Sequence, residues 1–243
     1  MQLINKRIVI TGGTSGIGYE MVKQLAADNE VVIIAKDRNK LDSVKQVIQG
    51  VVTYQADLSQ LPEVESVADA IVRRYESIDV FVNNAAIQFT PMFLDDDFRY
   101  ETIPYEVTLN FTSICSLTYL LLPALLHQHK ATILNVNSGL GLTPKASSAV
   151  YCATKGALNI FSQSLRYQLA QTNIHVQQAF LDLVDTPMTQ GRGQNKMSAQ
   201  TAALAIIRGI ESDISDHDIG KVRYLRWLLR LLPSVAQRIM KKY

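Results

Sequence analysis

A tyrosine and a lysine with the potential for proton-transfer chemistry lie four residues apart, at Tyr151 and Lys155. On a helix such residues share a face, so the Lys155 ammonium would lie beside the Tyr151 ring. A nearby cation favours the charged form of a phenol, so we expect the pKa of Tyr151 to fall from about 10 toward neutral pH. Such a tyrosine can act as a general acid or base toward an alcohol or a carbonyl. By itself this spacing is more often that of an amphipathic helix face, so other features must decide.

Ser138 supplies a hydroxyl thirteen residues before Tyr151. It follows the apolar run at residues 132–136, with Asn137 between them, and this run predicts a buried strand. The Ser138 side chain would then project from the carboxyl end of the strand, which is where ligands bind in open α/β sheets.

A glycine-rich turn near the start of the chain suggests a nucleotide site. Residues 7–11 predict a β-branched strand and residues 17–27 a helix, with Gly12, Gly16 and Gly18 in the turn between them. Glycines at this place let the backbone turn sharply, approach a pyrophosphate and present the helix N-terminus to its charge. The position at the first strand-to-helix turn makes the motif more specific than a glycine cluster alone.

Several separate features, in matching order, give the chain its resemblance to a known family. They are Thr-Gly-x-x-x-Gly-x-Gly from Thr11, an Asp at Asp57, an Asn-Asn-Ala-Ala segment from Asn83, a serine after the fifth strand, and Tyr-x-x-x-Lys. Over about residues 5–190 the chain resembles the short-chain dehydrogenase/reductase family. The resemblance implies an NAD(P)-dependent enzyme that interconverts a carbonyl and a secondary alcohol. One departure is Ala86, which stands where the family has glycine.

The resemblance also implies roles for individual residues. Tyr151 would be the general acid/base, Lys155 would lower its pKa and bind the ribose, Ser138 would orient the carbonyl, and Asn110 would complete a proton relay. The implied cofactor-binding residues are Gly12, Thr14, Ser15, Gly16, Ile17, Gly18, Lys36, Asp57, Leu58, Asn83, Ala85, Tyr151, Lys155, Val184 and Thr186. Leu140, Leu181 and Asp182 are expected in the substrate pocket, with Leu181-Asp182 where the family usually has Pro-Gly.

The residues after the second strand bear on the choice of cofactor. By family register, Ala35 stands where an NAD-type acid would be, and the basic Lys36 follows it. A basic residue there would pair with a 2′-phosphate, which favours NADP(H). NAD(H) stays an alternative, because Asp37 lies one residue further. If the alignment with the family were shifted by two residues, Asp37 would accept a hydrogen bond from the ribose 2′-hydroxyl.

Composition and patterning predict one α/β domain over residues 1–243. Six apolar strand segments alternate with helical ones, which predicts a Rossmann-like, doubly wound parallel sheet of about seven strands with helices on both faces. With no apolar run of roughly 18–20 residues, no secretory signal at residues 1–7, and two cysteines at no metal-site spacing, we expect a cytoplasmic protein without a metal site.

The C-terminal extension, residues 220–243, differs in charge from the rest. It carries seven basic and no acidic residues, which leaves 17 basic and 22 acidic residues elsewhere. Between residues 221 and 232 the arginines alternate with apolar residues at helical spacing. We expect an amphipathic helix that packs on the body or on a second subunit, and the alternative is an anchor at an anionic membrane surface.

The predicted partners are a small carbonyl or alcohol substrate and further copies of the chain, as a homodimer or homotetramer. No basic patch interleaved with aromatic residues indicates nucleic acid. Two other functions stay open from the sequence: a membrane-peripheral reductase of a lipid-like carbonyl, and a non-catalytic cofactor-binding scaffold.

Overall fold

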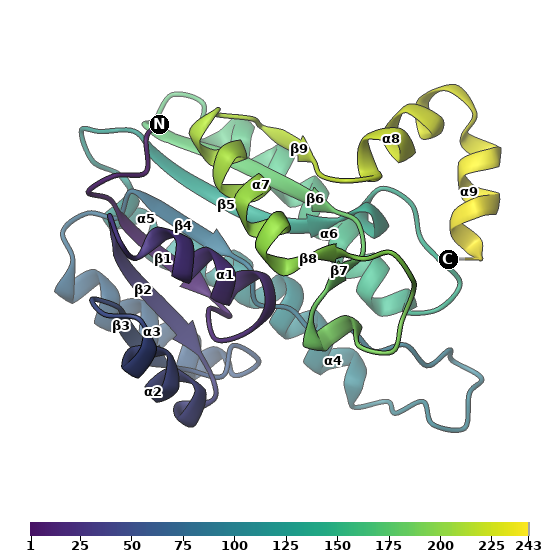
Figure 1. The fold of residues 1–243 in the computed structure, drawn as a ribbon, viewed down its shortest axis with the longest axis horizontal. Helices are drawn as coiled ribbons and strands as arrows, with labels where there is room; N and C mark the ends of the chain where they lie inside the picture. Colours follow the sequence, from purple (N-terminus) through teal and green to yellow (C-terminus); the bar gives the residue numbers. More distant parts are fainter. Residues whose placement is uncertain (243) are drawn as a thin grey trace.

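The buried apolar segments form a parallel sheet in the computed structural model, which describes residues 1–242 (Figure 1). Within those residues seven strands pair in the order β3-β2-β1-β4-β5-β6-β9. The strands are β1 Arg7–Thr11, β2 Glu30–Ala35, β3 Val52–Gln55, β4 Val80–Asn83, β5 Ala131–Ser138, β6 Ile174–Leu181 and β9 Asp216–Asp218. The order reverses between β1 and β4, which places a ligand crevice at the carboxyl ends of these strands.

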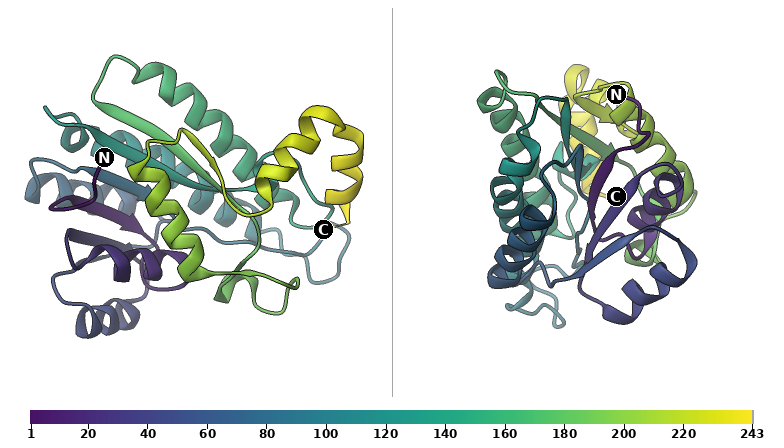
Figure 2. Two further views of the ribbon diagram at one scale, coloured as in Figure 1. Left: turned by 45° about the horizontal axis from the view of Figure 1, so that its top comes forward. Right: turned by 90° about the vertical axis from the view of Figure 1, so that its left-hand side faces the viewer.

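Helices cover both faces of the sheet, as the right-hand view of Figure 2 shows. Ile8 and Ile10 of β1 pack in the core on one face, and Val9 packs in the core on the other. This alternation explains why the strands are almost continuously β-branched, since both faces are buried. The first face carries α1 Gly16–Leu25, α2 Arg38–Val47 and α7 Ala199–Glu211, and the second carries α3 Leu61–Arg74, α5 Ser113–Leu125 and α6 Ala149–Gln168.

The prediction of a doubly wound parallel sheet is confirmed. The observed strand ends differ from the predicted ones by at most two residues. The short strand β9 was not predicted, because residues 216–218 are Asp-His-Asp and lack an apolar pattern. A two-stranded ribbon of β7 Val184–Asp185 and β8 Met197–Ser198 was also not predicted. It closes the segment that contains the turn η3 Pro187–Thr189.

One continuous helix contains α4 Thr102–Val107, the π-helical turn η1 Thr108–Thr112 and α5. By length and composition alone this helix, Thr102–Leu125, could cross a membrane, with a mean hydropathy of 1.4 over an 18-residue window. Its Leu117, Leu121 and Leu125 are fully buried in the core of the second face. This packing is that of a core helix.

Two helices, α8 Val222–Leu231 and α9 Pro233–Lys241, follow β9 and lie beyond the layers at one end of the molecule (Figures 1 and 2). The single amphipathic helix expected over residues 221–232 is therefore one half of a helical hairpin. Pro233 separates the two helices, since proline has no N–H with which to continue α8.

Candidate active site

The turn between β1 and α1 has a backbone geometry suited to an anion. Gly12 and Gly16 have φ of +69° and +53°, values that favour glycine. A Cβ on Gly18 would lie 2.2 Å from the Gly12 carbonyl oxygen, so only glycine lets the helix approach the strand this closely. Ser15 caps α1 with no side-chain hydrogen bond, and the first turn of α1 has no acidic residue. The first amides of α1 are therefore available to a phosphate.

The loop after β4 is attached to this turn through Thr11. The Thr11 Oγ1 accepts hydrogen bonds from the backbone N–H groups of Asn84 and Ala85, both at 3.0 Å. Asn84 also donates its Nδ2 to the Thr11 carbonyl at 2.9 Å and lines the cavity. Asn83 is buried behind the cavity, where its Nδ2 donates to Asn135 Oδ1 at 2.9 Å. Asn83 thus joins β4 to β5 and is not among the lining residues, whereas Asn84, Ala85, Ala86 and Gln88 line the cavity.

The far end of the cavity is lined by Lys36, Asp37 and Lys40, and by Asp57 and Leu58. Lys36 Nζ donates to the Tyr105 hydroxyl at 3.1 Å, and this bond raises the pKa of Lys36. The Asp37 carboxylate caps α2 by accepting from the Lys40 N–H at 3.1 Å.

Asp57 turns its Oδ1 toward Ser59, accepting from the Ser59 N–H at 2.9 Å and from the hydroxyl at 2.7 Å. This end of the cavity therefore combines lysine side chains with a fixed carboxylate.

The predicted catalytic residues Ser138, Tyr151 and Lys155 all line the same cavity. Tyr151 and Lys155 lie one turn apart on α6, with exposed fractions of 8% and 3%. Lys155 Nζ donates to the Val136 carbonyl at 2.8 Å and lies 5.7 Å from the centre of the Tyr151 ring. Ser138 ends β5, and its Oγ accepts from the Leu140 N–H at 3.2 Å.

The protonation states differ from the simple expectation. Burial raises the pKa of Tyr151 above its ordinary value of 10, and the nearby Ser138 hydroxyl and Arg192 only partly oppose this. Burial also lowers the pKa of Lys155 from 10.5 to about 8. In this geometry the Tyr151 phenol is therefore protonated at pH 7, while Lys155 is still mostly charged. The expectation that Lys155 outweighs burial and lowers the pKa of Tyr151 is wrong for this geometry, because desolvation of the phenolate dominates.

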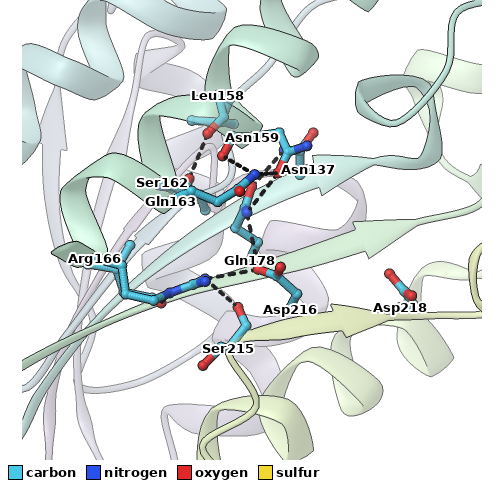
Figure 3. Close-up of polar contacts among 12 residues, drawn as sticks. Asn137, Leu158, Asn159, Ser162, Gln163, Arg166, Gln178, Ser215, Asp216 and Asp218 are labelled. Atoms are coloured by element: carbon cyan, nitrogen blue, oxygen red, sulfur yellow. Dashed lines mark hydrogen bonds and ion pairs between the residues drawn. The ribbon is translucent and has the colours of Figure 1, made fainter. Parts of the chain in front are cut away.

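A partly buried polar network fixes the backbone that carries Ser138 (Figure 3). Asn137 accepts from the Ser138 N–H at 2.8 Å and donates its Nδ2 to Gln178 at 3.0 Å. Gln178 donates to Asp216 at 3.1 Å, and Arg166 donates to the same carboxylate at 2.9 Å. The network connects β5, β6, β9 and α6, so the end of β5 is held from three neighbouring elements. No sequence motif indicated it.

Asn110 lies inside the π-helical turn η1, fully buried. Its side chain exchanges two hydrogen bonds with the backbone of Ile87, at 2.9 and 2.8 Å, and donates to Thr154 at 3.3 Å. A π turn widens the helix and frees backbone carbonyls from regular bonding, and such turns are frequent at functional sites. The regular hydrogen bonding of the helix is therefore interrupted at Asn110.

Glu106, one turn before Asn110, is a buried acid that sequence reasoning missed. It is 2% exposed and accepts from the Phe89 N–H at 3.2 Å. Burial raises its pKa from 4.5 to about 7. Its charge in turn raises the pKa of Tyr151. The sequence does carry one sign of this residue, because Glu106 lies four residues before Asn110 and would share its face of a helix.

Replacing Glu106 by glutamine should make the protein more stable at alkaline pH. A raised folded-state pKa means that the contribution of Glu106 to stability is lost as pH rises from about 4.5 through 7. We expect Glu106→Gln to raise the free energy of unfolding at pH 8 by about 1–3 kcal/mol and to change it little near pH 4.5. Urea unfolding at both pH values checks this, with the exposed Glu65→Gln as the matched control. Parallel pH profiles for wild type and Glu106→Gln would contradict it.

The cavity has a volume of about 600 Å³ and runs from the glycine turn past Tyr151 to the C-terminal hairpin. This volume suits a ligand of cofactor size. Beyond Tyr151 the lining is mostly apolar and includes two of the predicted pocket residues, Leu140 and Leu181. Asp182, the third, also lines it, as do Val184 and Thr186. Residues of this end that were not predicted are Met188, Val222, Tyr224, Leu225, Leu228, Ile239 and Met240.

Two basic residues near the apolar end of the cavity were also not indicated by any sequence motif. Lys145 lines the cavity, and burial lowers its pKa. Arg192, in the segment between η3 and β8, donates at 2.7 Å to Gln88, which lines the cavity. The segment around Arg192 is therefore attached to the loop after β4.

Comparison with known proteins agrees with this geometry. The sequence model of the short chain dehydrogenase family matches residues 6–197. An uncharacterized oxidoreductase, DltE of Bacillus subtilis, is 35% identical over 222 residues, covering 88% of this chain and 82% of that protein. A very-long-chain 3-oxoacyl-CoA reductase of Anas platyrhynchos is 29% identical over 96% of this chain and 78% of its own length.

Among solved structures, a short-chain dehydrogenase from Sphingobium yanoikuyae in complex with NADPH superimposes with a TM-score of 0.82. It covers 97% of this chain and 94% of its own, at 24% identity, and supports the fold. The family match covers most of the chain and, with the DltE relative, determines its family. The chain is an oxidoreductase of the short chain dehydrogenase family.

Proposed function

We propose that this enzyme uses NADPH to reduce the carbonyl group of an apolar substrate to a secondary alcohol. The observation that supports this most directly is the convergence of Ser138, Tyr151 and Lys155 in one cavity that continues into the glycine turn. The glycine cradle, which a Cβ at Gly18 would fill, fits a dinucleotide pyrophosphate. The apolar lining beyond Tyr151 and the 3-oxoacyl-CoA reductase relative support an acyl-chain carbonyl as substrate.

In this mechanism Ser138 and Tyr151 act on the carbonyl oxygen, and Lys155 acts through Tyr151. The Ser138 hydroxyl donates a hydrogen bond to that oxygen as negative charge develops on it. A reduced nicotinamide bound along the strand ends would supply the hydride that adds to the carbonyl carbon. Tyr151 gives its phenolic proton to the oxygen, and the new O–H completes the alcohol. The Lys155 ammonium stabilises the tyrosinate left behind, and reprotonation follows the relay beside Asn110.

The neutral state of Tyr151 supports the reductive direction. A buried phenol with a raised pKa holds its proton at pH 7, as a general acid must. Oxidation of an alcohol would require the phenolate, which burial disfavours.

The surroundings of Lys36 support NADP(H) over NAD(H). The Lys36 ammonium lies at the adenosine end of the cavity, whereas the Asp37 carboxylate that would read a ribose is used to cap α2. We expect tight NADPH and weaker NADH binding when nicotinamide fluorescence is titrated. Lys36→Ala should weaken NADPH binding about 10-fold through the lost charge-assisted hydrogen bond, with little effect on NADH.

Arg38→Ala is the matched control, since Arg38 is exposed and pairs with Asp42 on α2. An equal loss for NADPH and NADH, or a preference of the wild type for NADH, would reject Lys36 as the 2′-phosphate partner. A screen of ketones and 3-oxoacyl thioesters of increasing chain length, followed by NADPH oxidation, tests the reaction. Tight NADPH binding without turnover of any carbonyl would favour the cofactor-binding scaffold.

A further inference from the structure

The α8–α9 hairpin carries features that the proposed reaction does not require. It lies at one end of the molecule, outside the layers of sheet and helices (Figures 1 and 2). Val222, Ala236 and Met240 are buried on its inner side, so the hairpin is docked on the body. Arg226 holds it further, with two hydrogen bonds to Asp218 at 2.5 and 2.7 Å. The hairpin is thus a fixed part of the fold with an outer side of its own.

The outer side of the hairpin is apolar. On α8, Tyr224, Trp227 and Leu231 recur at helical spacing and are 62%, 64% and 66% exposed. Leu232 between the helices and Ile239 on α9 continue this surface, at 55% and 53% exposed. Clustered large apolar side chains in water mark an interaction site, because a surface without a partner rarely carries them together.

The same hairpin is strongly basic. All seven of its charged residues are positive, and six of them are exposed: Lys221, Arg223, Arg230, Arg238, Lys241 and Lys242. Arg226 is the member held by Asp218. An apolar stripe bordered by cations, with an exposed tryptophan and tyrosine, is the composition of a helix that lies at a membrane–water interface.

We propose that the outer side of the α8–α9 hairpin binds the surface of a membrane containing anionic phospholipid. The helices have 10 and 9 residues, too short to span a bilayer of about 30 Å, so they would lie along the interface. Charge favours lipid over a second copy seated hairpin to hairpin, because a two-fold contact would bring twelve exposed like charges together while anionic headgroups neutralise them.

The inner side of the hairpin connects this surface to the reaction, a step that rests on the proposed function. Val222, Leu225 and Leu228 line the apolar end of the cavity that contains Tyr151. Tyr224 and Ile239 line the same cavity and are also exposed, so the cavity reaches the surface between the two helices. A membrane bound there would present an apolar carbonyl substrate directly to the mouth of the cavity.

Trp227 provides the measurement, since it is the one tryptophan of the chain. Its emission should shift to shorter wavelength when the full-length protein is mixed with vesicles of phosphatidylglycerol and phosphatidylcholine, and not with phosphatidylcholine alone. Co-sedimentation should show the same dependence and weaken in high salt. A variant with Arg230, Arg238 and Lys241 replaced by glutamine should bind these vesicles on the order of 100-fold more weakly, about fivefold for each charge.

The matched control removes three positive charges elsewhere, with Lys45→Gln, Arg73→Gln and Arg208→Gln on exposed positions of α2, α3 and α7. This control should bind anionic vesicles like the wild type. Equal losses for both triple variants, or no wild-type binding to anionic vesicles, would overturn the proposal. So would a Trp227 shift that follows protein concentration without lipid, since it would identify a second copy as the partner.

The outcome is separable from that of the proposed function. None of the three hairpin cations lines the cavity, so the hairpin variant should reduce a water-soluble carbonyl without vesicles like the wild type. Lipid binding without any carbonyl reduction would reject the proposed function and leave the membrane surface standing.

Discussion

Replacement of Tyr151 by phenylalanine should lower kcat/KM for carbonyl reduction by about 10³-fold or more, because it removes the proposed general acid. The ring would keep its place on α6 and its distance from Lys155, so NADPH affinity should change by less than about twofold. The measurement is NADPH oxidation with the best carbonyl from the screen, alongside fluorescence titration of the cofactor. Loss of turnover with retained binding separates chemistry from cofactor affinity.

Tyr167 offers the matched control, since it lies on the same helix and is 77% exposed. Tyr167→Phe should leave both activity and cofactor affinity unchanged. A Tyr151→Phe enzyme with wild-type kcat/KM would remove Tyr151 as the proton donor. In that case Ser138, the other hydroxyl donor of the predicted set, would be the group to test next.

The parts of the site that sequence could predict are those encoded by short local patterns. The glycine turn depends on one strand, one turn and one helix in succession, so its residues Gly12 to Gly18 carry their own signal. The Tyr151–Lys155 pair depends only on helical spacing, and Ser138 on the end of an apolar run. The alternation of strands and helices likewise determines a parallel sheet, because each strand must return on the same side.

What could not be predicted depends on contacts between distant segments. The Gln178–Asp216 hydrogen bond joins residues 38 positions apart, and β9 supplies its aspartate without any apolar pattern. The C-terminal hairpin reaches the catalytic cavity only through tertiary packing, so Val222 and Met240 gave no sign of lining it. The direction of the Tyr151 pKa shift also depends on tertiary packing, because burial determines it. From the sequence only the charge of the neighbouring Lys155 could be predicted.

The second large effect is expected at Gly18. An alanine there would place its Cβ 2.2 Å from the Gly12 carbonyl oxygen and 2.6 Å from Asn84 Nδ2. Backbone atoms cannot give way as the end of a flexible side chain can, so the turn must deform. We expect Gly18→Ala to lower the free energy of unfolding by about 2–4 kcal/mol. Deforming the amides that we propose to bind the pyrophosphate should also weaken NADPH binding by at least about 10-fold.

Alanine substitutions at two further glycines separate the effect on stability from the effect on NADPH binding. Gly156 lies inside α6, and a Cβ added to it would meet no neighbouring atom within 4 Å, so Gly156→Ala should stabilise the protein by about 0.5–1 kcal/mol through helix propensity. Gly209→Ala would place its Cβ 2.3 Å from His217 Nδ1 on β9, so it should destabilise the protein while leaving NADPH affinity intact. Urea unfolding and NADPH titration of all three variants distinguish the two mechanisms. If Gly209→Ala lost as much NADPH affinity as Gly18→Ala, general destabilisation would account for both, and the glycine turn would lose its assignment as the phosphate cradle.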